Sequence, residues 1–140
     1  GREFPPTPPY LVGREKVREF ARAVFADAPQ HTDVEAARAA GFDDVVAPPT
    51  FAMVVQDLTL QQLLSEPDSG IVLARTIHAE QRFAYTRPIV AGDELTGRLR
   101  VTGVRMMAGN AMITSEAEIT DGSGAHVVTA TSVLLVGEGE

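Results

Sequence analysis

The sequence predicts an α+β fold in which a long buried helix is wrapped by an antiparallel β-sheet. Helix patterns fill the first half of the chain and strand patterns fill the second half, an order typical of α+β domains. The segment that begins FAMVV at Phe51 is apolar on nearly all sides over its first turns. A helix with no polar face is buried on most sides, so this segment is expected to be the central helix.

Length and composition restrict the function classes. The 140 residues are 44% hydrophobic, which predicts one domain spanning 1–140 with a core of its own. A net charge of −7 argues against nucleic-acid or anionic-membrane partners, and no apolar run approaches the length of a membrane span. Because there is no Cys and only three scattered His, we expect no metal and no cofactor. A cytoplasmic protein acting on small molecules is the resulting expectation.

An extended lead-in and an amphipathic helix open the chain. Residues 1–13 are Pro-rich, and proline removes amide donors and disfavours helix. The next segment predicts a helix over 14–25, because its apolar residues recur at helical spacing: Val17, Phe20, Ala21, Val24 and Phe25. Pro29 cannot continue that helix, so a turn is expected over residues 27–29.

Helix-capping signals follow the turn. Thr32 and Glu35 form a capping-box pattern that predicts a short helix over 33–40, closed at Gly41 by the residue type that best tolerates a left-handed conformation. Thr50 stands where an N-cap of the central helix is expected.

The second half of the chain predicts an antiparallel meander. Its stretches are rich in Val, Ile, Thr and aromatic residues, and turn-forming residues such as Ala-Gly-Asn and Asp-Gly-Ser-Gly separate them. The expected strands are 71–86, 94–106, 111–120 and 125–136.

Several of these features together resemble the MaoC-like hot-dog proteins, which include (R)-specific enoyl-thioester hydratases and (3R)-hydroxyacyl-thioester dehydratases. The segment RPIVAGDEL at 87–95 is similar to the strand entry of that family. The other matching residues are Pro29, His31, Asp33, Ala37, Gly41, Phe42, Val46 and Ala47. The resemblance covers nearly the whole chain and implies a single hot-dog fold that binds an acyl-CoA or acyl-carrier-protein thioester.

In the family that this chain resembles, an Asp and a His hold the water that is added to or removed from the thioester, and a backbone amide polarises the carbonyl. His31 matches that histidine. The Asp position is Ala26 here, and the nearest carboxylate is Asp27. The amide falls on Pro49, which has no N–H. The resemblance thus implies His31 and Asp27 as catalytic candidates and Pro49 and Thr50 as substrate-binding candidates.

An intact frame with a substituted site is similar to the accessory, acyl-binding subunits (UPF0336-type) of (3R)-hydroxyacyl-carrier-protein dehydratases. Such subunits pair with a second hot-dog subunit that carries the complete Asp and His. The resemblance therefore implies either a heterodimer with a catalytic hot-dog subunit or a homodimer. A dimer is also expected because a lone sheet leaves an edge and a helix face to cover.

Two other functions stay open. One is a self-sufficient hydratase that uses His31 and Asp27 and takes its carbonyl donor from Thr50. The other is a hot-dog thioesterase with Asp57 on the central helix as base or nucleophile. For Gln56 and Asp57 the plainer interpretation is a helix face turned to solvent or to a dimer seam. For His31 it is a surface histidine bonded to local backbone, and for Asp27 a turn residue. The methionines Met106, Met107 and Met112 could line an acyl tunnel or fill the core.

Overall fold

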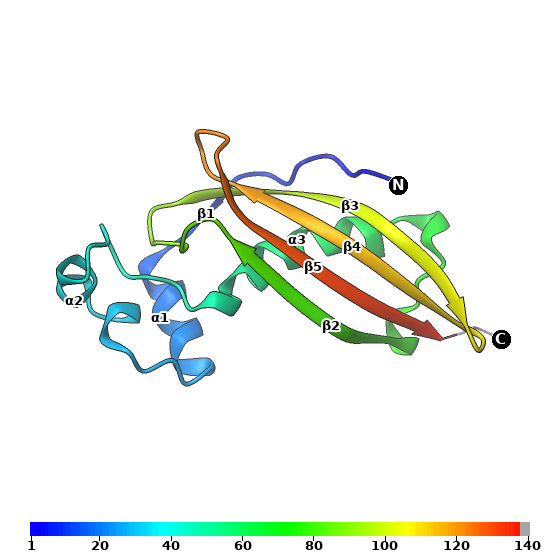
Figure 1. Cartoon of the computed structure of the whole chain (residues 1–140), viewed down its shortest axis with the longest axis horizontal. Coiled ribbons are helices and arrows are strands. Elements are labelled where there is room, and N and C mark those ends of the chain that lie inside the picture. The colour runs from blue at the N-terminus through cyan, green and yellow to red at the C-terminus, as the bar shows by residue number, and fades with distance from the viewer. Residues whose placement is uncertain (138–140) are drawn as a thin grey trace.

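The computed structural model describes residues 1–137, and it confirms the expected α+β hot-dog arrangement of one curled sheet and one long helix (Figure 1). The helices that precede the long one gather at one end of the sheet. In chain order the elements are β1 (Tyr10–Leu11), α1 (Arg14–Ala23), η1 (Pro29–His31), α2 (Val34–Ala39), η2 (Pro49–Phe51), α3 (Ala52–Leu64), η3 (Pro67–Ser69), η4 (Leu73–Arg75), β2 (Thr76–Tyr85), β3 (Glu94–Met107), β4 (Asn110–Thr120) and β5 (His126–Gly137).

The sheet is antiparallel throughout, with strand order β1-β3-β4-β5-β2. The helix α3 packs on its inner face and contacts β3, β4 and β5. Residues such as Phe51, Leu99 and Ile119 are completely buried between these layers. In β3 and β4 buried positions alternate with more exposed ones, and most of the buried residues are apolar, with Ser115 of β4 a polar exception.

A close approach between helix and sheet occurs at Gly97 of β3. A Cβ atom at this position would lie 2.6 Å from the Cγ2 atom of Thr59, nearer than any side-chain contact allows. Both residues are buried, so a strand residue without a side chain is what lets α3 settle on β3 at this level.

The Pro-rich lead-in covers the β3 edge of the sheet. The backbone N–H groups of Phe4 and Thr7 donate to the carbonyl oxygens of Leu99 and Gly97, each at 2.9 Å. The short strand β1 continues this pairing along the first residues of β3. At the opposite edge, β2 pairs with β5 on one side alone among the described residues, so its other side is free for a partner.

Three local predictions are corrected. The N-cap of α2 is Asp33 and not Thr32, because the helix starts at Val34. The Asp33 carboxylate accepts hydrogen bonds from the Glu35 and Ala36 amides. Thr50 caps nothing: it lies inside η2, a tight turn that runs directly into α3. Residues 71–75 are not strand, since η4 precedes β2.

Candidate active site

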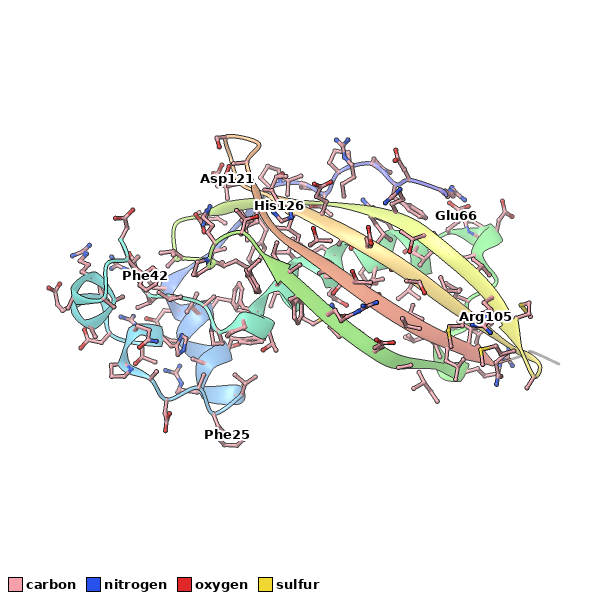
Figure 2. All side chains as sticks on the ribbon, in the orientation of Figure 1. Phe25, Phe42, Glu66, Arg105, Asp121 and His126 are labelled. Atoms are coloured by element: carbon pink, nitrogen blue, oxygen red, sulfur yellow. The ribbon has the colours of Figure 1, made fainter. Side chains whose placement is uncertain are left out.

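An apolar pocket of about 520 Å³ lies where the small helices meet the end of β2. Its residues come from η1, from the segment that leads into η2 together with Pro49, and from the end of β2 with the loop that follows, so three parts of the chain converge there. The lining residues are Gln30, His31, Phe42, Val46, Ala47, Pro49, Tyr85, Thr86, Arg87 and Pro88. Figure 2 shows Phe42 at this end of the molecule, far from Arg105 on the β3–β4 hairpin.

His31 is fixed in the pocket by hydrogen bonds that join Val46 to its ring and to the neighbouring residue Gln30. The ring nitrogen Nδ1 lies 2.6 Å from the Val46 carbonyl oxygen, and the Val46 amide donates to the carbonyl of the neighbouring Gln30 at 2.9 Å. A carbonyl only accepts, so Nδ1 carries the proton and Nε2 is the nitrogen left to exchange one. The half-buried imidazole is thereby held in one tautomer against the pocket, which is the arrangement that a general base or acid needs.

The pocket lining contains no carboxylate. Asp27 is exposed and is not among the lining residues, while Ala26, which precedes it, carries no acid. His31 is therefore the one imidazole in the lining, and no carboxylate stands beside it there.

Pro49 lies in the pocket wall, and the neighbouring Thr50 is exposed outside the lining. As a proline, Pro49 offers no N–H to a substrate carbonyl at the start of α3. Its own carbonyl oxygen accepts a hydrogen bond from the Tyr85 hydroxyl. The wall at this point thus presents apolar surface and an already bonded carbonyl.

Tyr85 is a pocket residue that the sequence patterns did not single out. Burial raises the pKa of its hydroxyl to about 12, partly offset by the Ala52 amide that faces the same oxygen. Its ring packs against Phe83 with centroids 6.3 Å apart. A β-strand pattern places aromatic residues without indicating which of them reaches a neighbouring turn, so no local signal marks this contact.

Arg87 lines the pocket and forms two ion pairs. Its guanidinium contacts Asp93 at 2.8 Å and Asp121 at 3.1 Å, and these carboxylates raise its pKa. The Asp121 pKa is held well below its usual range, by hydrogen bonds from Ser123 first and then by Arg87. The cation is balanced by two anions, so its role is to brace the loops around the pocket.

The remaining candidates lie away from the pocket. Asp57 is exposed, as the plainer interpretation predicted, and lines none of the hollows found in the described residues. For Gln56 that interpretation is wrong, because the side chain is fully buried and turned toward the sheet, where it donates to the Ala130 carbonyl at 3.2 Å. Met106 and Met107 are exposed on the far hairpin, so they line no tunnel leading from His31.

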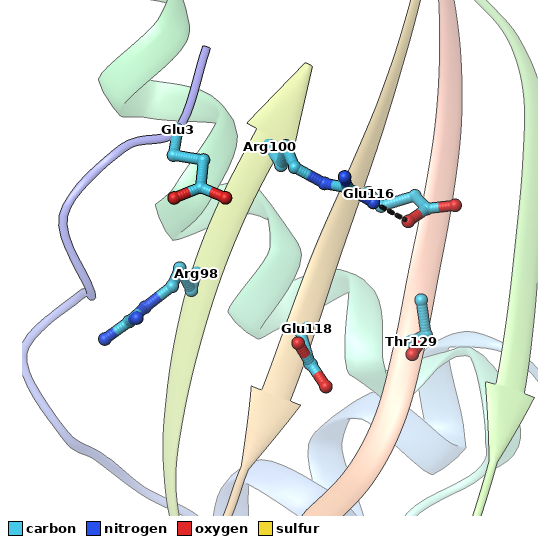
Figure 3. Close-up of a pocket in the computed structure, with 6 residues that line it drawn as sticks. All are labelled: Glu3, Arg98, Arg100, Glu116, Glu118 and Thr129. Atoms are coloured by element: carbon cyan, nitrogen blue, oxygen red, sulfur yellow. Dashed lines mark hydrogen bonds and ion pairs between the residues drawn. The ribbon is translucent and has the colours of Figure 1, made fainter. Parts of the chain in front are cut away.

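A second hollow, of about 300 Å³, lies on the outer face of the sheet (Figure 3). Its lining is almost wholly charged, with arginines from β3 beside glutamates from β4 and the lead-in. Arg100 pairs with Glu116 at 3.4 Å across the two strands. Such a surface offers nothing to an apolar chain, so the His31 pocket is the candidate site. No group of three or more His, Asp or Glu suited to a metal occurs within residues 1–137.

Comparison with known proteins decides the family. Residues 1–130 match the model of the FAS1-like dehydratase domain region. The chain belongs to this dehydratase family. Among the relatives of this chain, a UPF0336 protein of Clavibacter michiganensis subsp. michiganensis is 64% identical to it over 136 residues, covering 97% of this chain and 91% of that protein. A UPF0336 protein of Leifsonia xyli subsp. xyli is 59% identical with the same coverage.

Solved structures agree with the resemblance to MaoC-like dehydratases. The C-terminally truncated HadBC (3R-hydroxyacyl-ACP dehydratase) complex of Mycobacterium tuberculosis superposes with a TM-score of 0.81 at 34% identity, covering 95% of this chain and 92% of that one. A MaoC-like dehydratase gives 0.87 at 37% identity, covering 99% of this chain and 42% of the other. The (R)-hydratase of A. caviae, at 24% identity and 0.69, shares the fold.

Within residues 1–137 no helix combines the length and apolar character needed to cross a bilayer.

Proposed function

We propose that this chain is the acyl-thioester-binding subunit of a MaoC-like (3R)-hydroxyacyl-thioester dehydratase or enoyl-thioester hydratase, working with a catalytic hot-dog partner. The observation that carries the proposal is the composition of the pocket. It contains an oriented histidine, apolar walls and no carboxylate. A complete dehydratase site would also need a carboxylate and a donor to the thioester carbonyl. General acid–base catalysis typically raises the reaction rate by roughly 10² to 10⁴-fold.

The partner is proposed to dock along β2. This strand is the uncovered edge of the sheet, and Ile77 on it is 63% exposed. The other edge is covered by the lead-in, so a second sheet can add its strand at one side alone. The relative whose structure is the HadBC complex is a two-subunit dehydratase by name, which supports a heteromeric assembly here.

The geometry of His31 also favours a second candidate, a self-sufficient hydratase. Because Nδ1 is bonded to Val46, Nε2 is available for proton transfer without any partner. In that case Asp27 would supply the carboxylate after a movement of the turn that carries it, and Thr50 would supply the carbonyl donor. Asp27→Asn would then abolish the activity of the isolated chain.

The decisive experiment co-purifies the chain from its native host and measures hydration of crotonyl-CoA and crotonyl-carrier protein. We expect a second hot-dog protein in the preparation and activity that the isolated chain lacks. A homogeneous preparation of this chain that hydrates crotonyl-CoA at an enzyme-like rate, with His31→Ala inactive, contradicts the subunit proposal and favours the second candidate.

A further inference from the structure

Two residues in the wall of the His31 pocket, Tyr85 and Pro49, contact each other across the two elements that flank it. Tyr85 ends β2, and Pro49 stands at the turn that leads into α3. The Tyr85 hydroxyl donates to the Pro49 carbonyl oxygen and so bridges the seam between strand and helix. An acyl chain that ran past His31 toward the space between α3 and the sheet would therefore meet the Tyr85 ring.

The Tyr85 ring is held firmly in place. It packs on Phe83, the next inward side chain along β2. Because burial raises the pKa of the Tyr85 hydroxyl to about 12, the phenol keeps its proton, and with it the bond to Pro49, across the physiological pH range. The bond therefore orients the ring across that range, while the volume of the ring itself is what fills the space beside Pro49.

Farther along β2 from Tyr85, a belt of polar side chains lies between the sheet and α3 and is an unfavourable environment for an alkyl chain. Ser115, Ser132 and Gln81 stand side by side on β4, β5 and β2, facing α3. The Gln81 amide donates to the Gln56 side chain at 2.6 Å, and the two serine hydroxyls are 3.1 Å apart. Gln56 and both serines are buried, so a methylene chain crossing the belt would leave buried polar groups without partners.

We propose that the pocket is specific for a short acyl group and that the Tyr85 ring is the wall that sets its length. This inference rests on the proposed acyl-thioester-binding function and adds the substrate class. Tyr85 acts by excluding volume, so it is a specificity-determining residue and takes no part in proton transfer. Its effect should depend on the ring and be insensitive to the hydroxyl.

Isothermal titration with butyryl-, hexanoyl-, octanoyl- and dodecanoyl-CoA tests the inference. In wild type the affinity should stop rising between butyryl-CoA and octanoyl-CoA. Tyr85→Ala should let it continue to rise, by up to about fourfold per added methylene, the value expected when the chain is fully buried. Tyr85→Phe keeps the ring and should stop at the same length as wild type. Thermal unfolding establishes that each variant is folded.

Two results overturn the wall. One is a wild-type affinity that rises steadily through dodecanoyl-CoA, and the other is a folded Tyr85→Ala protein with the wild-type length limit. A parallel titration with butanol, hexanol and octanol separates the wall from the proposed function. If the thioesters fail to bind but the alcohols show the length limit and Tyr85→Ala removes it, the role of Tyr85 is supported and the proposed thioester-binding function is contradicted. Absence of a limit in the alcohols as well overturns both.

Discussion

At the scale of single residues, the site is defined by what surrounds His31. The imidazole is oriented by its hydrogen bond to the Val46 carbonyl. At the two positions where the family resemblance places an Asp and an amide donor, the chain has Ala26 and Pro49, which supply neither a carboxylate nor an amide hydrogen. The proposed subunit role depends on this difference.

Restoring those groups should restore chemistry. We predict that Ala26→Asp combined with Pro49→Gly raises crotonyl-CoA hydration by the isolated chain at least 10²-fold, the lower end of what an acid–base group or an oxyanion donor contributes. Glycine leaves the carbonyl that Tyr85 binds in place. The matched control is Ala26→Asn with Pro49→Gly, which should stay inactive. Equal activity in both variants would show that the gained carboxylate is irrelevant.

Tyr85 gives the pocket a spectroscopic signal, since the chain has two Tyr and no Trp. The difference in alkaline absorbance between wild type and Tyr85→Phe should titrate near pH 12, because burial raises this pKa to about 12 from an ordinary value of 10.0. A raised folded-state pKa stabilises the fold fully below pH 10 and loses that contribution as the pH rises toward 12. The stability difference between the two proteins should therefore be constant up to pH 10 and shrink above it. A difference spectrum that titrates at pH 10 contradicts the buried placement.

Sequence reasoning singled out His31 and Pro49 from the spacing of a motif, and both line the pocket, whereas Ala26 is not among the lining residues. It missed Tyr85 because its role arises from a contact across 36 residues, which no local pattern encodes. It also left Gln56 on the wrong side of α3, since a helix that is apolar nearly all round gives no face from which to judge direction.

At the scale of elements, helices and strands were predictable and their ends were less so. Gly41 closes α2 at a φ of 97°, as its type suggested. Adjacent polar residues can each serve as an N-cap, however. Asp33 and not Thr32 caps α2, because the backbone geometry that sets the first helical residue is not visible in the sequence. The η2 turn likewise took Thr50 out of a capping position, because two prolines in succession favour a tight turn before the helix begins.

The seating of α3 on β3 is the packing feature most open to test. Gly97→Ala should lower the free energy of unfolding by about 1–3 kcal/mol, the usual cost of overpacking, because its Cβ would press on the Thr59 methyl. Thr59→Ser removes that methyl, so adding Gly97→Ala to it should cost much less. Gly103→Ala is the control, since its Cβ would meet Thr114 no nearer than 4.0 Å. Denaturant unfolding of the wild type and the four variants measures this, and an equal cost of Gly97→Ala in both backgrounds would contradict it.

At the scale of the whole molecule, the two edges of the sheet differ. The lead-in occupies the β3 edge with backbone hydrogen bonds, and its prolines leave few donors for a further strand. The β2 edge is open along its length among the described residues. We therefore expect one partner per chain, added at β2.

A charge at that edge should disrupt the assembly. Ile77→Lys places a cation on the exposed part of β2, and charged edge residues oppose strand pairing. We predict that it weakens association at least tenfold in sedimentation equilibrium and leaves the fold intact. Leu11→Lys is a matched control, because Leu11 is 62% exposed at the covered edge. Equal loss of association in both variants would place the interface elsewhere.

The measurement that tests the central claim most directly pairs binding with turnover on one preparation of the isolated chain. Butyryl-CoA binding is measured by calorimetry, and crotonyl-CoA hydration is followed in the same sample. The proposed role as an acyl-binding subunit predicts saturable binding without hydration above that of His31→Ala. Enzyme-like hydration that His31→Ala abolishes, or the absence of any thioester binding, would contradict it.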